Sequence, residues 1–178
     1  MNYFEVFGLP RLLDIDLQAL ERRFHELSRK YHPDYFSTAS VEDKQQALRM
    51  TALLNDAYRT LRHPIRRVEY LVALEGFKSD GSKVPQSFLM EIFEINEQMQ
   101  DVKAGSAGKE QVVTLGQEIR RRAASFENQL ETASRDWDRL LEAKAPEADL
   151  KKQLSKLTEI LSESSYIRNL ERDLEESA

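Results

Sequence analysis

The tripeptide His32-Pro33-Asp34 carries the residue types closest to chemistry in this sequence. A carboxylate can orient an imidazole so that the ring acts as a general base, as in a catalytic triad. That chemistry also needs an activated nucleophile or a phosphate-binding loop. The sequence offers no evident nucleophile beside the pair and no glycine-rich phosphate motif. We therefore expect no enzyme, and the tripeptide is either a polar turn or a signal for another protein.

Metal chemistry has equally little support. The chain has no cysteine, which removes thiolate ligands, disulfides and cysteine nucleophiles together. Its three histidines, His25, His32 and His63, show no metal-type pairing with one another or with nearby carboxylates. We expect no cofactor and no metal in this chain, so that any metal would belong to a partner.

Composition favours a mostly helical protein. Of the 178 residues, 40% are hydrophobic and 32% charged, with only 6 Gly and 5 Pro. No apolar run approaches the roughly 18 residues that a membrane-spanning helix needs. The first five residues lack the layout of a secretory signal. We predict an all-α fold, no membrane contact, and a chain that stays in the compartment where it is made.

Charge is unevenly distributed. Residues 1–75 hold 11 basic and 11 acidic side chains, whereas residues 76–178 hold 15 and 20, so the net charge of -5 lies in the second part. A nucleic-acid-binding domain is normally basic. We therefore expect no nucleic-acid partner.

The elements around the tripeptide form an antiparallel helix pair. Asp14 or Asp16 can cap a first long helix, which Pro33 ends because proline disfavours helical geometry at the residue before it. Apolar residues spaced by three and four form its inward stripe: Leu17, Leu20, Phe24, Leu27 and Tyr31. A second long helix begins near Val41, and Pro64 opens a shorter one. The tripeptide thus lies in a loop whose position two packed helices fix.

A basic face runs along the outside of the first long helix. Arg22 and Arg29 point opposite the apolar stripe, and Arg23 and Lys30 lie on its flanks. A solvated helix surface is the simplest interpretation of such residues, and a docking face for an acidic partner is the alternative.

Three further helices are predicted near residues 85–102, 110–144 and 147–175. Gly- and Ser-rich segments at 76–83 and 103–108 separate them, as loops should. Long apolar seams on neighbouring helices imply an antiparallel bundle, in which Trp137 is a core residue.

The helix from Pro85 has more apolar residues than one face can bury. Its inward stripe is complete with Phe88, Ile92, Ile95, Met99 and Val102. Three large apolar residues remain outside that stripe, beside polar and acidic ones: Leu89, Met90 and Phe93, with Glu94, Glu97, Gln100 and Asp101. An exposed patch of this kind usually marks a partner surface, unless another part of the chain covers it. Tyr166 also lies beside its helix's apolar stripe, where a single exposed aromatic is common.

Residues 1–75 resemble a J domain, the helical module by which J-proteins stimulate the ATPase of seventy-kilodalton heat-shock chaperones. The resemblance is carried by YF at 3–4, FGL at 7–9, Phe24, RKYHPD at 29–34, NDAYRTL at 55–61 and the segment from Pro64 to Tyr70. Many family members carry Lys after the Asp, where this chain has Tyr35. The family's chaperone-binding residues would fall on His32, Pro33, Asp34, Arg22, Arg23, Arg29 and Lys30.

The segments FGLP, LRHPIRRVEYL and FLMEIFEINEQM narrow the resemblance to HscB (Jac-type) J-proteins, which are dedicated to iron–sulfur cluster biogenesis. The similarity covers essentially the whole chain and is strongest through residue 101. It implies a J domain at 1–75, a linker at 76–84 and a three-helix domain at 85–178. It also implies a cytoplasmic protein of the bacterial form, which we expect to be a monomer.

In that family the J domain engages a specialised chaperone, HscA, and the carboxy-terminal domain grips the iron–sulfur scaffold protein IscU. The resemblance places the scaffold-binding positions on Leu89, Met90, Phe93, Glu94, Glu97, Asp101 and Tyr166. Two alternatives are a J-protein for general unfolded clients and a structural helical adaptor. Promiscuous binding needs a flexible surface, which one short patch beside ordered carboxylates resembles poorly.

Overall fold

The structure is a computed structural model that describes residues 1–36, 38–77 and 85–177. Every regular element in these ranges is a helix, which confirms the all-α prediction. The elements are α1 (Tyr3–Val6), α2 (Leu17–Lys30), the short 3-10 helix η1 (Pro33–Phe36), α3 (Val41–Arg62), α4 (Pro64–Leu74), α5 (Gln86–Lys103), α6 (Lys109–Glu142) and α7 (Glu147–Ser177). None of these helices is both long enough and apolar enough to span a membrane.

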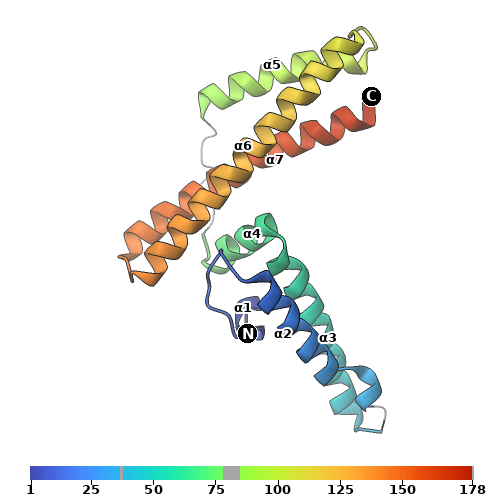
Figure 1. Ribbon diagram of the computed structural model, residues 1–178, viewed down its shortest axis with the longest axis vertical. Helices are drawn as coiled ribbons and strands as arrows, with labels where there is room; N and C mark the ends of the chain where they lie inside the picture. The colour runs from blue at the N-terminus through green and yellow to red at the C-terminus, as the bar shows by residue number, and fades with distance from the viewer. Residues whose placement is uncertain (37, 78–84, 178) are drawn as a thin grey trace.

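Helices α2 and α3 form the predicted antiparallel pair, with η1 in the turn that joins them (Figure 1). Of the two candidate caps for α2, Asp16 is the one used, since its carboxylate accepts from the backbone N–H groups of Gln18 and Ala19 at 2.9 and 3.0 Å. The helix ends at Lys30, three residues before Pro33, as proline requires. The turn is therefore held between two capped helices.

The interior of this pair is apolar and aromatic. Leu20 packs inside with the α3 residues Leu54, Ala57 and Leu61, all fully buried. The rings of Phe24 and Tyr58 stack between the two helices with centroids 4.2 Å apart. At the base of the pair, the rings of Tyr3 and Tyr70 stack at the same centroid distance, and the Tyr3 backbone N–H donates to the Tyr70 hydroxyl. These contacts join the short helices α1 and α4 to the hairpin.

One residue of the predicted α2 stripe is not buried. Leu17 is about half exposed, although the stripe placed it inward with Leu20. It stands in the first turn of α2 and lines a cleft toward α6, together with Arg62 at the end of α3. Helical spacing gives the side of a helix on which a residue lies, but not how completely neighbouring elements cover it.

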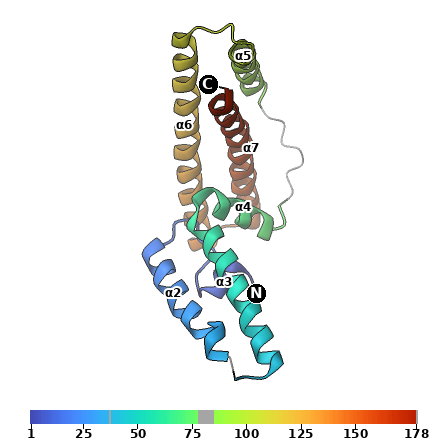
Figure 2. The same cartoon turned by 90° about the vertical axis from the view of Figure 1, so that its right-hand side faces the viewer.

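Helices α6 and α7 form a long antiparallel pair, and α5 packs across one end of it (Figures 1 and 2). The predicted seam of α6 is buried, including Leu130 and Trp137, and it meets Leu157 and Leu170 of α7. A buried amide adds a polar tie, because Gln153 Nε2 donates to the Ala133 carbonyl at 2.6 Å. Helices α6 and α7 are thus joined by both apolar packing and a buried hydrogen bond.

The amino-terminal helices adjoin the bundle at α4, which packs on α7, and at the segment before α2, which packs on α6 (Figure 2). One continuous cluster of buried residues runs from Phe4 to Leu174. Most of the linker predicted at 76–84 lies outside the described residues, which resume at Pro85. The α2–α3 turn and α5 lie toward opposite ends of the molecule in both views.

Candidate functional site

The loop holding His32 and Asp34 projects from the tip of the α2–α3 pair. The backbone N–H of Asp34 donates to His32 Nδ1 at 3.3 Å, and the Asp34 carboxylate lies 3.5 Å from the same nitrogen. The His32 side chain is 55% exposed, and Asp34 is more exposed still. A His–Asp pair this open to water is not enclosed in a reaction site. It is instead accessible to another protein, as a recognition surface must be.

The position of the loop is fixed by neighbouring elements. The Tyr35 N–H donates to the His32 carbonyl at 3.0 Å, which closes the turn. The Thr51 hydroxyl of α3 donates to the Tyr31 carbonyl at 3.1 Å and ties the end of α2 to the facing helix. The tripeptide is thus presented in one orientation without burying its polar groups.

The basic face leads along α2 to this loop. Arg22, Arg23, Arg29 and Lys30 are all exposed, as the helical spacing predicted. Arg23 reaches Glu26 at 3.4 Å, and Arg22 lies 3.9 Å from Asp16. Within the described residues, Arg29 and Lys30 make no ion pair, so the two cations nearest the tripeptide keep their charges available to a partner.

The outward face of α5 carries the apolar residues that the sequence left without a place in the core. Leu89, Met90 and Phe93 are 50%, 60% and 63% exposed, while Phe88, Ile95, Met99 and Val102 are buried on the opposite side. No described part of the chain covers the patch. Its neighbours on the same face are the exposed carboxylates of Glu94, Glu97 and Asp101.

Tyr166 of α7 contacts α5 at Phe88, the residue that precedes Leu89 in the chain. Its ring is T-shaped against Phe88, with centroids 6.2 Å apart, and the side chain remains nearly half exposed. The predicted scaffold-binding residues thus come from two helices that pack together. We call the set Leu89, Met90, Phe93 and Tyr166 the apolar patch.

The surroundings of the apolar patch are acidic. On α7, burial raises the pKa of Glu163, and the neighbouring carboxylates Glu159 and Glu91 raise it further. Arg122 of α6 offsets part of this charge through an ion pair with Glu91 at 2.9 Å. A partner surface that carries basic groups around an apolar centre would match this region.

A third feature, which sequence reasoning missed, lies where the segment before α2 meets α6. The buried carboxylate of Asp138 accepts from the backbone N–H groups of Leu13 and Asp14, each at 2.7 Å. The adjacent Trp137 Nε1 donates to the Arg11 carbonyl at 3.2 Å. Trp137 is therefore a core residue, as predicted, and also a contact between the two parts of the chain.

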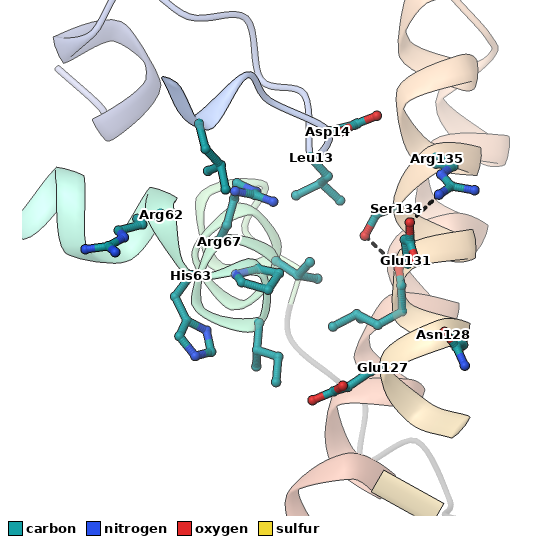
Figure 3. A pocket seen from close by; sticks show the side chains of 15 residues that line it. Leu13, Asp14, Arg62, His63, Arg67, Glu127, Asn128, Glu131, Ser134 and Arg135 are labelled. Carbon is teal, nitrogen blue, oxygen red and sulfur yellow. Dashed lines mark hydrogen bonds and ion pairs between the residues drawn. The ribbon is translucent and has the colours of Figure 1, made fainter. Parts of the chain in front are cut away.

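The only sequence signal for this contact was a polar stripe. Glu127, Glu131, Ser134 and Asp138 follow one another at spacings of four, three and four along α6. Such a stripe resembles a solvated helix face. In the structure its first three residues line a cleft of about 520 Å³ between α6 and the amino-terminal helices, whose opposite wall includes Asp14, His63 and Arg67 (Figure 3).

Three comparisons bear on the family. Residues 84–175 match the family model described as the HSCB C-terminal oligomerisation domain. A co-chaperone protein HscB homolog from Vibrio cholerae is 42% identical over 107 residues, which span 58% of this chain and 63% of that protein, less than two thirds of its length. The homolog from Vibrio campbellii is 31% identical over 95% of this chain and 98% of the relative.

The fold comparison extends over the whole molecule. The solved structure of the chaperone HscB from Vibrio cholerae aligns with 98% of this chain and 99% of that chain, at 32% identity and a TM-score of 0.63. The J-domain-like hairpin and the three-helix bundle therefore occur together in a relative, in the same order. Since the family model matches more than half of the residues and a relative aligns along almost the entire length, this chain belongs to the HscB co-chaperone family.

Proposed function

We propose that this protein is a co-chaperone that stimulates the ATPase of an HscA-type heat-shock chaperone and delivers an IscU-type iron–sulfur scaffold protein to it. The observation that carries this proposal is the pairing of two unlike exposed surfaces at opposite ends of one molecule. One is a charged loop with unpaired cations, and the other is the apolar patch flanked by carboxylates.

The chaperone arm consists of His32, Pro33 and Asp34 with Arg22, Arg23, Arg29 and Lys30. The unpaired charges of Arg29 and Lys30 suit an acidic surface on the ATPase domain. Charged groups of this kind speed encounter and set orientation more than they add affinity, and salt screens them. The effect of the tripeptide on ATP hydrolysis is taken from the J-protein resemblance.

The scaffold arm consists of the apolar patch with Glu94, Glu97 and Asp101. Burying a large apolar side chain contributes roughly 1.5–3 kcal/mol, so three of them and a tyrosine can anchor an interface. The carboxylates would surround that anchor and select a partner with basic groups at its rim. The scaffold, not this chain, would hold the cluster.

The domain limits follow the same division. We propose a J domain at 1–75, a linker at 76–84 and a scaffold-binding domain at 85–178. We also propose that the protein is cytoplasmic and monomeric. Because the matching family model is described as an oligomerisation domain, the monomeric state should be tested by sedimentation equilibrium across a range of concentrations.

The deciding experiment is steady-state ATPase of the cognate chaperone with this protein, with the scaffold, and with both. We expect stimulation by this protein alone and a larger rate with both, because one adaptor places client and chaperone at high effective concentration. Equal stimulation by any unfolded polypeptide in place of the scaffold would favour the general J-protein. A rate that none of the additions changes would favour the structural adaptor.

A further inference from the structure

The segment before α2 is fastened to α6 by one buried carboxylate. Asp138 is only 8% exposed, and its two oxygens each accept one backbone N–H, from Leu13 and from Asp14. Two consecutive N–H groups that would otherwise lack partners thus converge on a single anion. Hydrogen bonds to an ionised acceptor are about twice as strong as neutral ones.

We call the contact of residues 11–14 with Trp137 and Asp138 of α6 the joint. Neighbouring contacts hold the segment in one orientation on α6. Trp137 Nε1 donates to the Arg11 carbonyl, and the Leu13 side chain is fully buried beside it. The segment is therefore held at three successive points, by an indole, a carboxylate and an apolar side chain. Among the described residues, the remaining polar tie between the two parts, Arg168 to Glu69 at 3.9 Å, is exposed and long, so it adds little.

Burying this carboxylate costs desolvation free energy, which an apolar side chain at the same position would not. Desolvation raises the pKa of Asp138, and the charges of Asp14 on the segment and Glu142 on its own helix raise it further. The backbone N–H groups act in the opposite direction, and the Arg67 guanidinium of α4 faces the same site. Replacing a buried ion by an apolar group of similar size is often neutral or stabilising. Unlike an apolar group, the carboxylate also fixes the direction of the two hydrogen bonds that it accepts.

The joint lies at a point from which a small rotation is amplified. Asp16, two residues after Asp14, caps α2, and α2 spans 14 residues to the tripeptide loop. At 1.5 Å per residue, that loop lies about 20 Å from the joint. On the other side, α6 packs on α7, which in turn carries α5 and Tyr166. The contacts at Asp138, together with the packing of α4 on α7, therefore set where the loop lies relative to the apolar patch.

We infer that Asp138 is a positioning residue, whose carboxylate holds residues 11–14 against α6 and thereby fixes the orientation of the chaperone arm relative to the scaffold arm. The geometric half of this inference is that Asp138 fixes the orientation, and it depends only on the contacts above. The delivery half is that this orientation matters for presenting the scaffold, and it rests on the proposed function. A scaffold held at a fixed angle is presented to the chaperone in one arrangement, whereas a free joint spreads it over many.

The orientation can be measured directly, because the chain contains no cysteine. Gln45→Cys on α3 and Gln117→Cys on α6 place nitroxide labels at two exposed sites, one on each side of the joint. Pulsed electron–electron double resonance then gives the distribution of distances between the two labels. We expect a narrow distribution in the otherwise unchanged chain and a distribution at least twice as broad with Asp138→Ala, which leaves both N–H groups without an acceptor.

Graded variants and a matched control protect this test against unfolding. Asp138→Asn keeps one acceptor oxygen and should broaden the distribution less, and Trp137→Phe removes the bond to the Arg11 carbonyl together with part of a buried ring. If Asp138→Ala loses its helical circular dichroism, these two variants decide the matter. Ser134→Ala is the control, because Ser134 lines the same cleft one turn away and its hydroxyl bonds only to Leu130 of its own helix.

The functional readout is the extra ATPase stimulation that the scaffold adds. With Asp138→Ala, we expect this increment to fall about fivefold as the fixed geometry is lost. Stimulation without scaffold and scaffold affinity should each stay within about twofold, since neither arm contains Asp138.

An unchanged narrow distribution in the folded Asp138 variants would overturn the inference. So would a broadened distribution with an undiminished scaffold increment, because the joint would then position nothing that matters. A wild-type protein that stimulates no cognate chaperone would refute the proposed function and the delivery half with it. The distance measurement would still decide the geometric half.

Discussion

The two ends of the molecule expose different kinds of groups. At the α2–α3 turn the exposed residues are a histidine, a carboxylate and two unpaired cations, and the nearby backbone is tied by hydrogen bonds. On α5 the exposed residues are a leucine, a methionine and a phenylalanine on one regular helix. The turn is suited to orienting a partner by charge and shape, and the helix face to holding one by burial of apolar area.

This difference predicts that the two activities separate. Changes at the turn should alter chaperone stimulation and leave scaffold affinity alone, and changes on α5 should do the opposite. Each prediction below either separates the two ends or shows that they are coupled.

The largest effect is expected from His32→Gln. Glutamine keeps a polar side chain of similar length, yet it loses the exposed imidazole whose Nδ1 accepts from the Asp34 N–H. We expect chaperone stimulation to be abolished, with helical content and scaffold affinity unchanged. The measurement is steady-state ATPase alongside calorimetric titration of the scaffold.

The control for that change is His25→Gln, which alters an exposed histidine within α2 that lies 4.0 Å from Glu21. It should leave stimulation intact. Equal loss in both variants would mean that general damage to α2, and not the tripeptide, accounts for the effect.

The next largest effect is expected from Leu89→Ala combined with Phe93→Ala. Removing two exposed anchors of the apolar patch should weaken scaffold binding by about 2 kcal/mol or more, which is the size of an interface hot spot. Because neither side chain is in the core, the melting temperature should hardly change. Leu48→Ala on α3 removes a comparably exposed leucine from the other part of the molecule and should not alter scaffold affinity. A double variant that binds the scaffold normally would remove α5 from the interface.

A smaller effect is expected from Arg29→Gln. Exposed charge pairs contribute roughly 0.2–1 kcal/mol, so the half-maximal concentration for ATPase stimulation should rise only a few-fold. Raising salt should shrink the difference between variant and wild type, because screening weakens the wild-type contact. Arg139→Gln, which removes a more exposed arginine from α6, is the control. A difference that persists unchanged at high salt would argue for a packing role of the Arg29 side chain.

The sequence predicted the helices and both exposed surfaces well, because both depend on local rules. Spacing by three and four placed Leu89, Met90 and Phe93 outside the core, and Pro33 set the end of α2. The sequence could not predict the contact of Asp138 with residues 13 and 14, since this contact links residues more than 120 positions apart through backbone N–H groups. Backbone donors leave no pattern in the side chains. The prediction for Leu17 was wrong for a related reason, because the spacing does not reveal how completely neighbouring elements cover a residue.

The smallest effect concerns the joint between the two ends and is read from the pH dependence of stability. The folded-state pKa of Asp138 is raised, chiefly by burial. Near that pKa the folded protein therefore binds more protons than the unfolded chain, so the free energy of unfolding falls as pH rises through it. Asp138→Asn cannot titrate and should lack this slope.

Urea denaturation of wild type and Asp138→Asn at a series of acidic to neutral pH values measures the slope directly. Because carboxylates remote from this site titrate alike in both proteins, subtracting the two curves isolates Asp138 together with its electrostatic neighbours Asp14 and Glu142. We expect the stability advantage of the wild type over the variant to be greatest at the acid end and to decline toward neutrality. A difference that instead grows with pH would mean that the two backbone N–H groups stabilise the carboxylate by more than burial costs it. The joint would then fasten the two ends most tightly in its ionised form.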